Sequence, residues 1–287
     1  MARIPLLTNP LAPYIIMCPR VFSKEDCIAK KGGNVKKLIA LLFVACLFLP
    51  FSESSKAEEP CVTKYECFDS RGAKRWTAVT TVKAMPALGE RVYQMTEKGE
   101  GIYSGYTGKV KWEALLEYEE TDILKPLRSE KTVYDEKGKV LSKETHAFDY
   151  ANKEMGMKYE NFASGKKIDK KFSFKGNILD NLSLDPYIQT MLENSKKRAK
   201  AELVTSDPDF YNVDIRVKSE ETIEKDGKKI SAYKICVDPN LGLLNVVKSF
   251  GPKAYFWHDT KAPHDWLMYR GPEDKTDSPT VEIRVVN

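Results

Sequence analysis

The segment KVKWEALLEYE, residues 109–119, has the clearest periodicity in the chain. Every second residue from Val110 to Tyr118 is apolar, and the residues between them are charged except for Leu115. Because successive side chains of a β-strand point to opposite faces, this segment predicts a strand with one buried and one solvated face. Such a strand is typical of an antiparallel sheet that is covered on one side.

Further strands are predicted on both sides of this segment from β-branched and aromatic residues. Short turns such as Asp135-Glu136-Lys137-Gly138 join them, and no crossover helix interrupts the first half, so we expect an antiparallel meander. The glycines Gly99, Gly101, Gly105 and Gly108 are expected in turns, because their spacing does not fit a dinucleotide-binding loop. The predicted strands are 75–85, 92–95, 109–119, 127–134, 139–150, 154–162, 168–174, 211–217, 230–238, 254–258, 266–270 and 281–285.

One main helix is predicted from Asp185, with Asp185 as N-cap and Pro186 at the first helical position. Ile188, Met191 and Leu192 follow at helical spacing, and the basic residues 196–200 are expected in its final turns, where they complement the helix dipole. A second, shorter helix is expected around 243–250, ended by Gly251-Pro252.

An export signal is predicted at residues 35–57, VKKLIALLFVACLFLPFSESSKA. Its apolar run matches the roughly 10 to 14 residues usual for a signal core rather than the about 20 of a membrane span. Cleavage is expected after Ala57, leaving Glu58 first, and lipid anchoring at Cys46 is an alternative. Residues 1–34 are interpreted as an upstream extension that is not translated, or else as a disordered cytoplasmic tail. Residues 58–287 are then one β-rich domain in the periplasm or at the outer membrane of a Gram-negative bacterium.

The net charge of the predicted mature chain argues against nucleic acid as a partner. The whole chain carries 46 Lys and Arg and 41 Asp and Glu, of which 8 and 3 lie in residues 1–57, so residues 58–287 hold 38 of each. Nucleic acid binding requires a basic field on the folded domain, and this neutral domain lacks one.

Three cysteines, Cys61, Cys67 and Cys236, remain after the predicted cleavage, in a compartment where disulfides persist. In a continuous strand the Cα atoms of Cys61 and Cys67 would lie about 20 Å apart, beyond the roughly 7 Å that a bridge allows. A Cys61–Cys67 bridge therefore predicts a looped N-terminus. A Cys67–Cys236 bridge between neighbouring strands is the alternative.

Four titratable side chains gather between two predicted strands: His258, Asp259, His264 and Asp265. Imidazole and carboxylate groups can bind Zn²⁺ or act as a general base. Their spacing matches no metal signature, and Pro263 indicates a turn, so we expect no metal, no catalytic residue and no cofactor.

The C-terminal third resembles an exported bacterial family known as domain of unknown function 3108. The resemblance is carried by Phe256-Trp257-His258-Asp259, Leu267-Met268-Tyr269-Arg270-Gly271-Pro272 and Ser278-Pro279-Thr280-Val281-Glu282-Ile283, and it extends over most of the mature chain. It implies a strongly curved antiparallel sheet around a helix, like that of lipoprotein carriers, and no activity. The fold class expected is therefore mainly β: a single curved antiparallel sheet or half-open β-barrel with one main helix.

Aromatic residues and methionines are numerous enough to line an apolar pocket in such a sheet. The leading hypothesis is a non-catalytic envelope protein that holds a lipid or acyl chain; a plain interaction or scaffold module of the envelope is an alternative, and a metal-assisted hydrolase using His258 and His264 is another. The oligomeric state is left open. The residues expected to line the pocket are Trp76, Trp112, Tyr118, Met155, Met157, Tyr159, Phe172, Phe174 and Trp257.

Overall fold

The structure, a computed structural model, describes residues 60–205, 210–225, 227–239, 253–273 and 278–286. The predicted export signal with its cleavage point and the helix expected at 243–250 lie outside these residues. The elements are β1 (Cys61–Asp69), β2 (Lys74–Ala84), β3 (Val92–Ile102), β4 (Lys109–Glu120), β5 (Leu124–Asp135), β6 (Val140–Asp149), β7 (Glu154–Asn161), β8 (Lys166–Ser173), β9 (Ile178–Asp180), α1 (Leu184–Glu193), β10 (Arg198–Val204), β11 (Phe210–Lys225), β12 (Lys228–Pro239), β13 (Ala254–Asp259), β14 (Trp266–Pro272) and β15 (Thr280–Val286).

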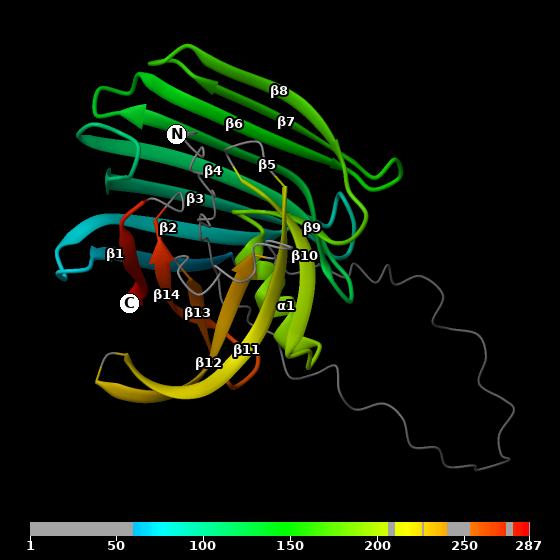
Figure 1. Cartoon of the computed structure of the whole chain (residues 1–287). Coiled ribbons are helices and arrows are strands. Elements are labelled where there is room, and N and C mark those ends of the chain that lie inside the picture. Colours follow the sequence, from blue (N-terminus) through cyan, green and yellow to red (C-terminus); the bar gives the residue numbers. More distant parts are fainter. Residues whose placement is uncertain (1–59, 206–209, 226, 240–252, 274–277, 287) are drawn as a thin grey trace, which may run out of the picture.

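All of these strands belong to one sheet, in the order β8-β7-β6-β5-β4-β3-β2-β1-β15-β14-β13-β12-β11-β10-β9. Neighbours along the chain are neighbours in the sheet, and β1 pairs with β15, so the order is cyclic with a single break between β8 and β9. Every pairing is antiparallel except that of β9 with β10. The predicted fold class is confirmed: a mainly β protein with a curved antiparallel sheet that does not close into a barrel (Figure 1).

The sheet curves around α1, which lies on its concave side (Figure 1). All residues from Leu184 to Leu192 are buried, including Asp185 and Gln189. The helix has no solvated stripe, and its buried polar side chains meet partners inside the protein: Asp185 lies 3.0 Å from His258 Nε2, Gln189 donates to Pro263 O and Thr190 donates to Glu120. Among the described residues α1 is the one helix, and with ten residues it is too short to cross a membrane.

The helix begins and ends earlier than the sequence suggested. Ser183, not Asp185, is the N-cap, and the basic residues at 196–200 do not extend α1. Ser195 has a φ of 56°; its amide donates to Leu192 O over 2.8 Å, and the amide of Lys196 donates to Met191 O over 3.0 Å. These two bonds form a Schellman motif that ends the helix at Glu193. The next residues then enter β10, a strand that was not predicted.

The N-terminal prediction was wrong at the cysteines. Residues 61–69 form the continuous strand β1, and Cys67 and Cys236 are buried free thiols. Three strands, β13 to β15, separate β1 from β12, where Cys236 lies. Neither predicted bridge, Cys61–Cys67 or Cys67–Cys236, is therefore formed.

The prediction of turns at Gly99 and Gly101 was also wrong, because both residues lie inside β3. Gly99 is paired with Trp112 on β4, and a Cβ atom on Gly99 would lie 2.1 Å from the Trp112 ring. Gly101 is paired with Trp76 on β2, and with a φ of 142° its missing Cβ leaves room for the backbone of Arg75 and Trp76, the nearest atom being Arg75 O at 2.4 Å. Gly99 thus makes room for the Trp112 ring, which meets the Trp76 ring edge to face with centroids 5.4 Å apart.

Candidate ligand-binding face and buried polar clusters

The break in the sheet is closed by side chains where β9 meets the inner face of β5 and β6. Asp180 on β9 accepts a hydrogen bond from Ser129 Oγ and lies 3.1 Å from His146 Nδ1. His146 Nε2 lies 3.0 Å from Glu144 Oε1, an ionic contact. Burial lowers the pKa of His146, but its contacts with Asp180 and Glu144 outweigh this and raise it to about 10. The imidazolium thus holds two acidic side chains at the junction.

This cluster is not a nucleophilic triad. The hydroxyl of Ser129 donates to the carboxylate of Asp180 rather than to the imidazole of His146, so no base accepts its proton in the way that acyl transfer requires. The adjacent hollow has a volume of only about 20 Å³, roughly the space of one water molecule. The arrangement is suited to joining strands and leaves no room for a substrate.

A row of polar side chains continues across the inner face from this cluster. Lys131 on β5 is paired with Glu144 on β6, and two strands away Glu97 on β3 accepts a 2.6 Å hydrogen bond from Trp112 Nε1. Burial raises the pKa of Glu97 to about 7, and the charge of Lys131 opposes this rise. The Lys131 ammonium lies 4.4 Å from the centre of the Tyr103 ring, a cation–π contact.

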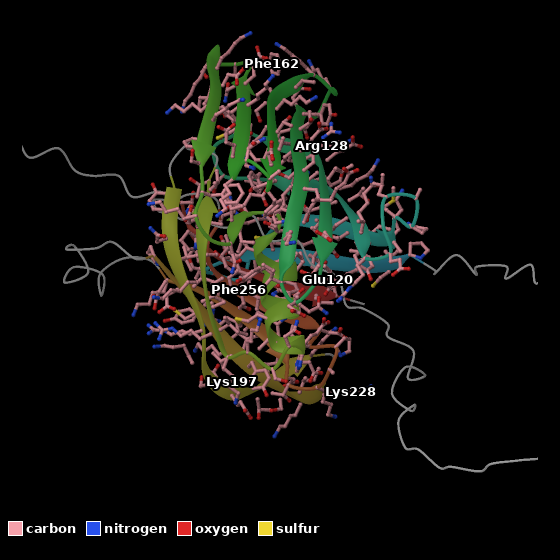
Figure 2. All side chains as sticks on the ribbon, turned by 90° about the vertical axis from the view of Figure 1, so that its right-hand side faces the viewer. Glu120, Arg128, Phe162, Lys197, Lys228 and Phe256 are labelled. Carbon is pink, nitrogen blue, oxygen red and sulfur yellow. The ribbon has the colours of Figure 1, made fainter. Side chains whose placement is uncertain are left out.

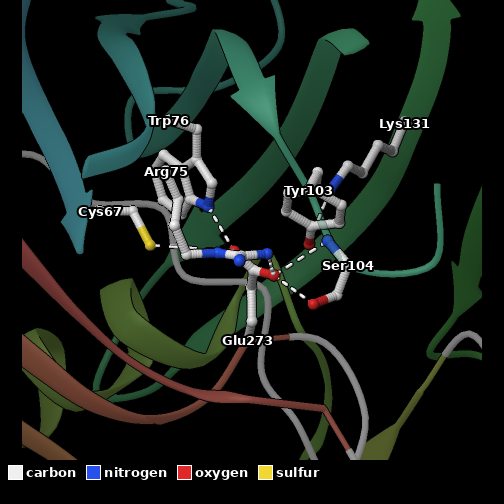
Figure 3. Close-up of polar contacts among 7 residues, drawn as sticks. All are labelled: Cys67, Arg75, Trp76, Tyr103, Ser104, Lys131 and Glu273. Carbon is white, nitrogen blue, oxygen red and sulfur yellow. Dashed lines mark hydrogen bonds and ion pairs between the residues drawn. The ribbon is translucent and has the colours of Figure 1, made fainter. Parts of the chain in front are cut away.

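A second buried cluster is organised by Glu273, which follows β14 (Figure 3). Its carboxylate accepts hydrogen bonds from Arg75 Nε and Nη2 at 2.9 and 2.7 Å, from Trp76 Nε1 at 2.8 Å and from the Ser104 amide at 2.9 Å. The hydroxyl of Ser104 also donates to it, and Cys67 Sγ lies 3.9 Å away. Burial, followed by the nearby Glu273 charge, raises the pKa of the Cys67 thiol, which disfavours the thiolate. This cysteine is therefore not an activated nucleophile.

The side chains of the four residues considered as metal ligands have separate contacts rather than a common centre. His258 donates through Nδ1 to His264 O over 2.9 Å, and its Nε2 lies 3.0 Å from Asp185 Oδ1 on α1, with both side chains buried. Burial raises the pKa of Asp185, and His258 opposes this rise. His264 donates to Asp259 O over 2.9 Å.

Asp265 is half-buried, and its Oδ1 has no hydrogen-bond partner among the described residues. No group of three or more His, Cys, Asp or Glu side chains that could hold a metal occurs in the described part of the chain. The imidazole of His258 instead fixes α1 to β13.

The residues expected to line one apolar pocket are divided among three packed clusters. Trp76, Trp112 and Tyr118 lie in the main core around α1, and Trp257 lies in a small cluster with Leu267. The others form a cluster under β6–β8 that contains Met155, Met157 and Phe174, with Tyr159 and Phe172 partly buried beside it.

The third cluster marks a face that extends beyond the rest of the molecule. Figure 1 shows β6, β7 and β8 extending at one side of the sheet, beyond β9; Figure 2 shows Phe162, which follows β7, at an extremity of the molecule. Tyr159 and Phe172 share the inner face of β7–β8 with the fully buried Met155 and Met157, and Ile168 is paired with Tyr159. The exposed Lys170, paired with Met157, lies on the same face between Ile168 and Phe172. We call the half-buried side chains Tyr159, Ile168 and Phe172 the inner stripe.

The outward face of β6–β8 is charged. An open hollow of about 520 Å³ lies there, with six of its eight lining residues polar or charged: Lys143, Thr145, Lys158, Glu160, Lys167 and Asp169. The other two are Tyr159 and Ile168, whose side chains alternate to the inner face. The hollow is not the apolar cavity that lipid enclosure would require. A bound apolar group would have to lie against the inner stripe instead.

Several of these features were missed from the sequence. Asp180, Lys131, Glu97 and Glu273 were not singled out, although Glu97 and Lys131 lie at inward positions of their strands and could have been recognised by alternation. Asp180 and Glu273 meet partners far along the chain, and no local pattern indicates such contacts.

Comparisons with protein-family models, with curated proteins and with solved structures gave no match for this chain. The resemblance to the exported family therefore stays a prediction, and function has to be argued from the described residues.

Proposed function

We propose that this protein is a non-catalytic, exported protein of the bacterial envelope that holds a lipid or acyl chain against the inner face of β6–β8. The observation that carries the proposal is the inner stripe, Tyr159, Ile168 and Phe172, which continues the buried cluster of Met155 and Met157 toward solvent. Removing apolar surface from water contributes about 25 cal/mol per Å². An acyl chain on this stripe would extend the existing apolar cluster.

The break in the sheet supports access to this face. Strand β8 pairs only with β7, and β9 pairs only with β10, so no backbone hydrogen bonds close the gap between them. Access from the free edge of β8 therefore requires no backbone hydrogen bond to break, although side chains at the Asp180 junction bridge β9 to β5 and β6.

The proposal is tested by mass spectrometry of organic extracts from protein purified out of a bacterial envelope. We expect bound lipid in wild type and at least a severalfold smaller amount in Tyr159→Ser/Ile168→Ser. The matched control is Val79→Ser, an apolar-to-polar change at a 39% exposed position on the outward face of β2. Native protein free of lipid would refute the proposal and favour the scaffold alternative.

A further inference from the structure

The turn between β7 and β8 presents an aromatic side chain to solvent. Phe162 is 48% exposed and is the one aromatic among the large apolar residues exposed in the described part of the chain. Figure 2 places it at an extremity of the molecule, at the tip of the projecting hairpin. A single exposed apolar residue is common on protein surfaces, so a partner is inferred here from the conformation and the charge around Phe162.

The tip is held in a defined conformation. The amide of Phe162 donates to Leu141 O over 2.9 Å, which ties the tip to β6. The side chain of Asn161 accepts from the amides of Ala163 and Ser164 at 3.0 and 2.9 Å, and Gly165 has a φ of 71°. Phe162 is therefore presented by a structured turn, and little ordering entropy has to be lost when it binds.

The same hairpin carries a surplus of positive charge. Residues 154–175 contain six lysines and three acidic residues, a net charge of +3. Each acidic residue faces a lysine across the strands: Lys167–Glu160 at 2.5 Å, Lys158–Asp169 at 3.9 Å and Lys171–Glu154 at 3.7 Å. Beyond these three pairs the hairpin carries three more lysines, Lys166, Lys170 and Lys175, which account for the net charge of +3.

We propose that the β7–β8 hairpin is a membrane-docking element that binds the surface of an anionic lipid bilayer. Phe162 enters the interface, where aromatic rings are favoured, and the lysines around it attract anionic headgroups. The charge surplus selects this partner over a second copy of the chain, because two hairpins of charge +3 repel each other. This docking site is separate from the proposed ligand-holding role and does not depend on it.

Another hairpin of the protein provides a contrast. The turn between β11 and β12 also projects and carries Lys228 and Lys229, but no aromatic residue lies between residues 219 and 232, and the 22 residues 216–237 carry a smaller net charge of +2. Because its tip lacks an aromatic side chain, this hairpin is expected to bind an anionic surface less well.

The test uses an exposed tryptophan as a local reporter in the full chain. The native indoles Trp76, Trp112, Trp257 and Trp266 are at most 6% exposed, so the F162W variant adds the one accessible indole at the hairpin tip. Vesicles of phosphatidylglycerol brominated on the acyl chains quench an indole only when it enters the bilayer. Quenching at position 162 reports on the hairpin whatever residues 1–59 do, since those residues contain no tryptophan.

We expect a blue shift and quenching of F162W fluorescence by anionic vesicles and little change with phosphatidylcholine vesicles. Adding K166Q and K167Q should raise the lipid concentration for half-maximal quenching about 30-fold, because each lysine near an anionic surface contributes about 1 kcal/mol to binding. The control changes K228Q and K229Q should leave it unchanged.

The proposal would be overturned if anionic vesicles quenched F162W no more than wild type. It would also be overturned if neutral vesicles quenched F162W as strongly as anionic ones. Capture of the hairpin by another protein without vesicle quenching would also overturn it. If F162W is not quenched but lipid is found in extracts, the docking proposal is wrong and the ligand-holding proposal stands. If F162W is quenched but extracts contain no lipid, only the ligand-holding proposal is wrong.

Discussion

Replacing Gly99 by alanine tests whether β3 is built around the Trp112 ring. A Cβ atom on Gly99 would lie 2.1 Å from Cζ2 and 2.3 Å from Cε2 of Trp112, far inside van der Waals contact. The ring has nowhere to move, because it packs against Trp76 and Tyr103 with centroids 5.4 and 5.2 Å away and donates to Glu97. Accommodating the methyl group therefore requires β3 to shift and the indole to leave its hydrogen bond.

The cost follows from two contributions. Overpacking of a core costs about 1–3 kcal/mol, and loss of a hydrogen bond to a carboxylate costs about 1.5–3 kcal/mol. The smaller conformational entropy of alanine in the unfolded chain offsets about 0.4–1 kcal/mol of this. We therefore expect Gly99→Ala to lower the free energy of unfolding by about 2–5 kcal/mol.

The matched control is Gly156→Ala in β7. Gly156 is also a strand glycine, and a Cβ atom there would have nothing within 4 Å. The control should be neutral or slightly stabilising. Urea denaturation followed by circular dichroism measures both variants. If Gly99→Ala were as stable as Gly156→Ala to within about 1 kcal/mol, the packing argument would be wrong.

Three further predictions concern the buried polar groups. Glu273→Ala leaves Arg75 and four other donors without their acceptor, and we expect a loss of about 3–5 kcal/mol in urea denaturation; an unchanged midpoint would contradict this. The pKa of Glu97 is raised to about 7 in the folded state, so its stabilising effect is present at low pH and is lost as pH rises from about 4.5 to 7; Glu97→Gln should therefore lose less stability than wild type over that range, and parallel pH profiles would refute the assignment. Peptide mapping after alkylation should find Cys67 and Cys236 unmodified in native protein and modified after unfolding, because both thiols are buried and their pKa values are raised by burial.

Alternation of apolar and charged residues was sufficient to predict the fold class. It identified β4 almost residue for residue, and it identified most of the later hairpins. It failed where the reason for a residue lies on a neighbouring strand: Gly99 was read as a turn residue, although its partner Trp112 requires a glycine there. It also failed at Cys67, because the expected Cys61–Cys67 bridge led to the prediction of a loop where the strand β1 lies.

The candidate site was harder to predict than the fold. The inner stripe includes Tyr159 and Phe172, which were among the expected pocket residues, but the structure separates them from Trp112 and Trp257. Which aromatics share a cluster depends on how far the sheet curves and on where β9 meets β6. That junction is made by Asp180 and His146, which lie on different elements, and no pattern in either segment indicates their contact.

The pairing of β1 with β15 has a consequence for how the polypeptide acquires its structure. Tyr65 lies opposite Val285, so the middle of the sheet is completed by residues from nearly opposite ends of the chain. Two nascent meanders, β1–β8 and β9–β15, each retain an open central edge until the final strand is synthesised and docks, and contacts of such high sequence separation form slowly. A product truncated before β15 would display the unpaired edges of β1 and β14, which are templates for aggregation.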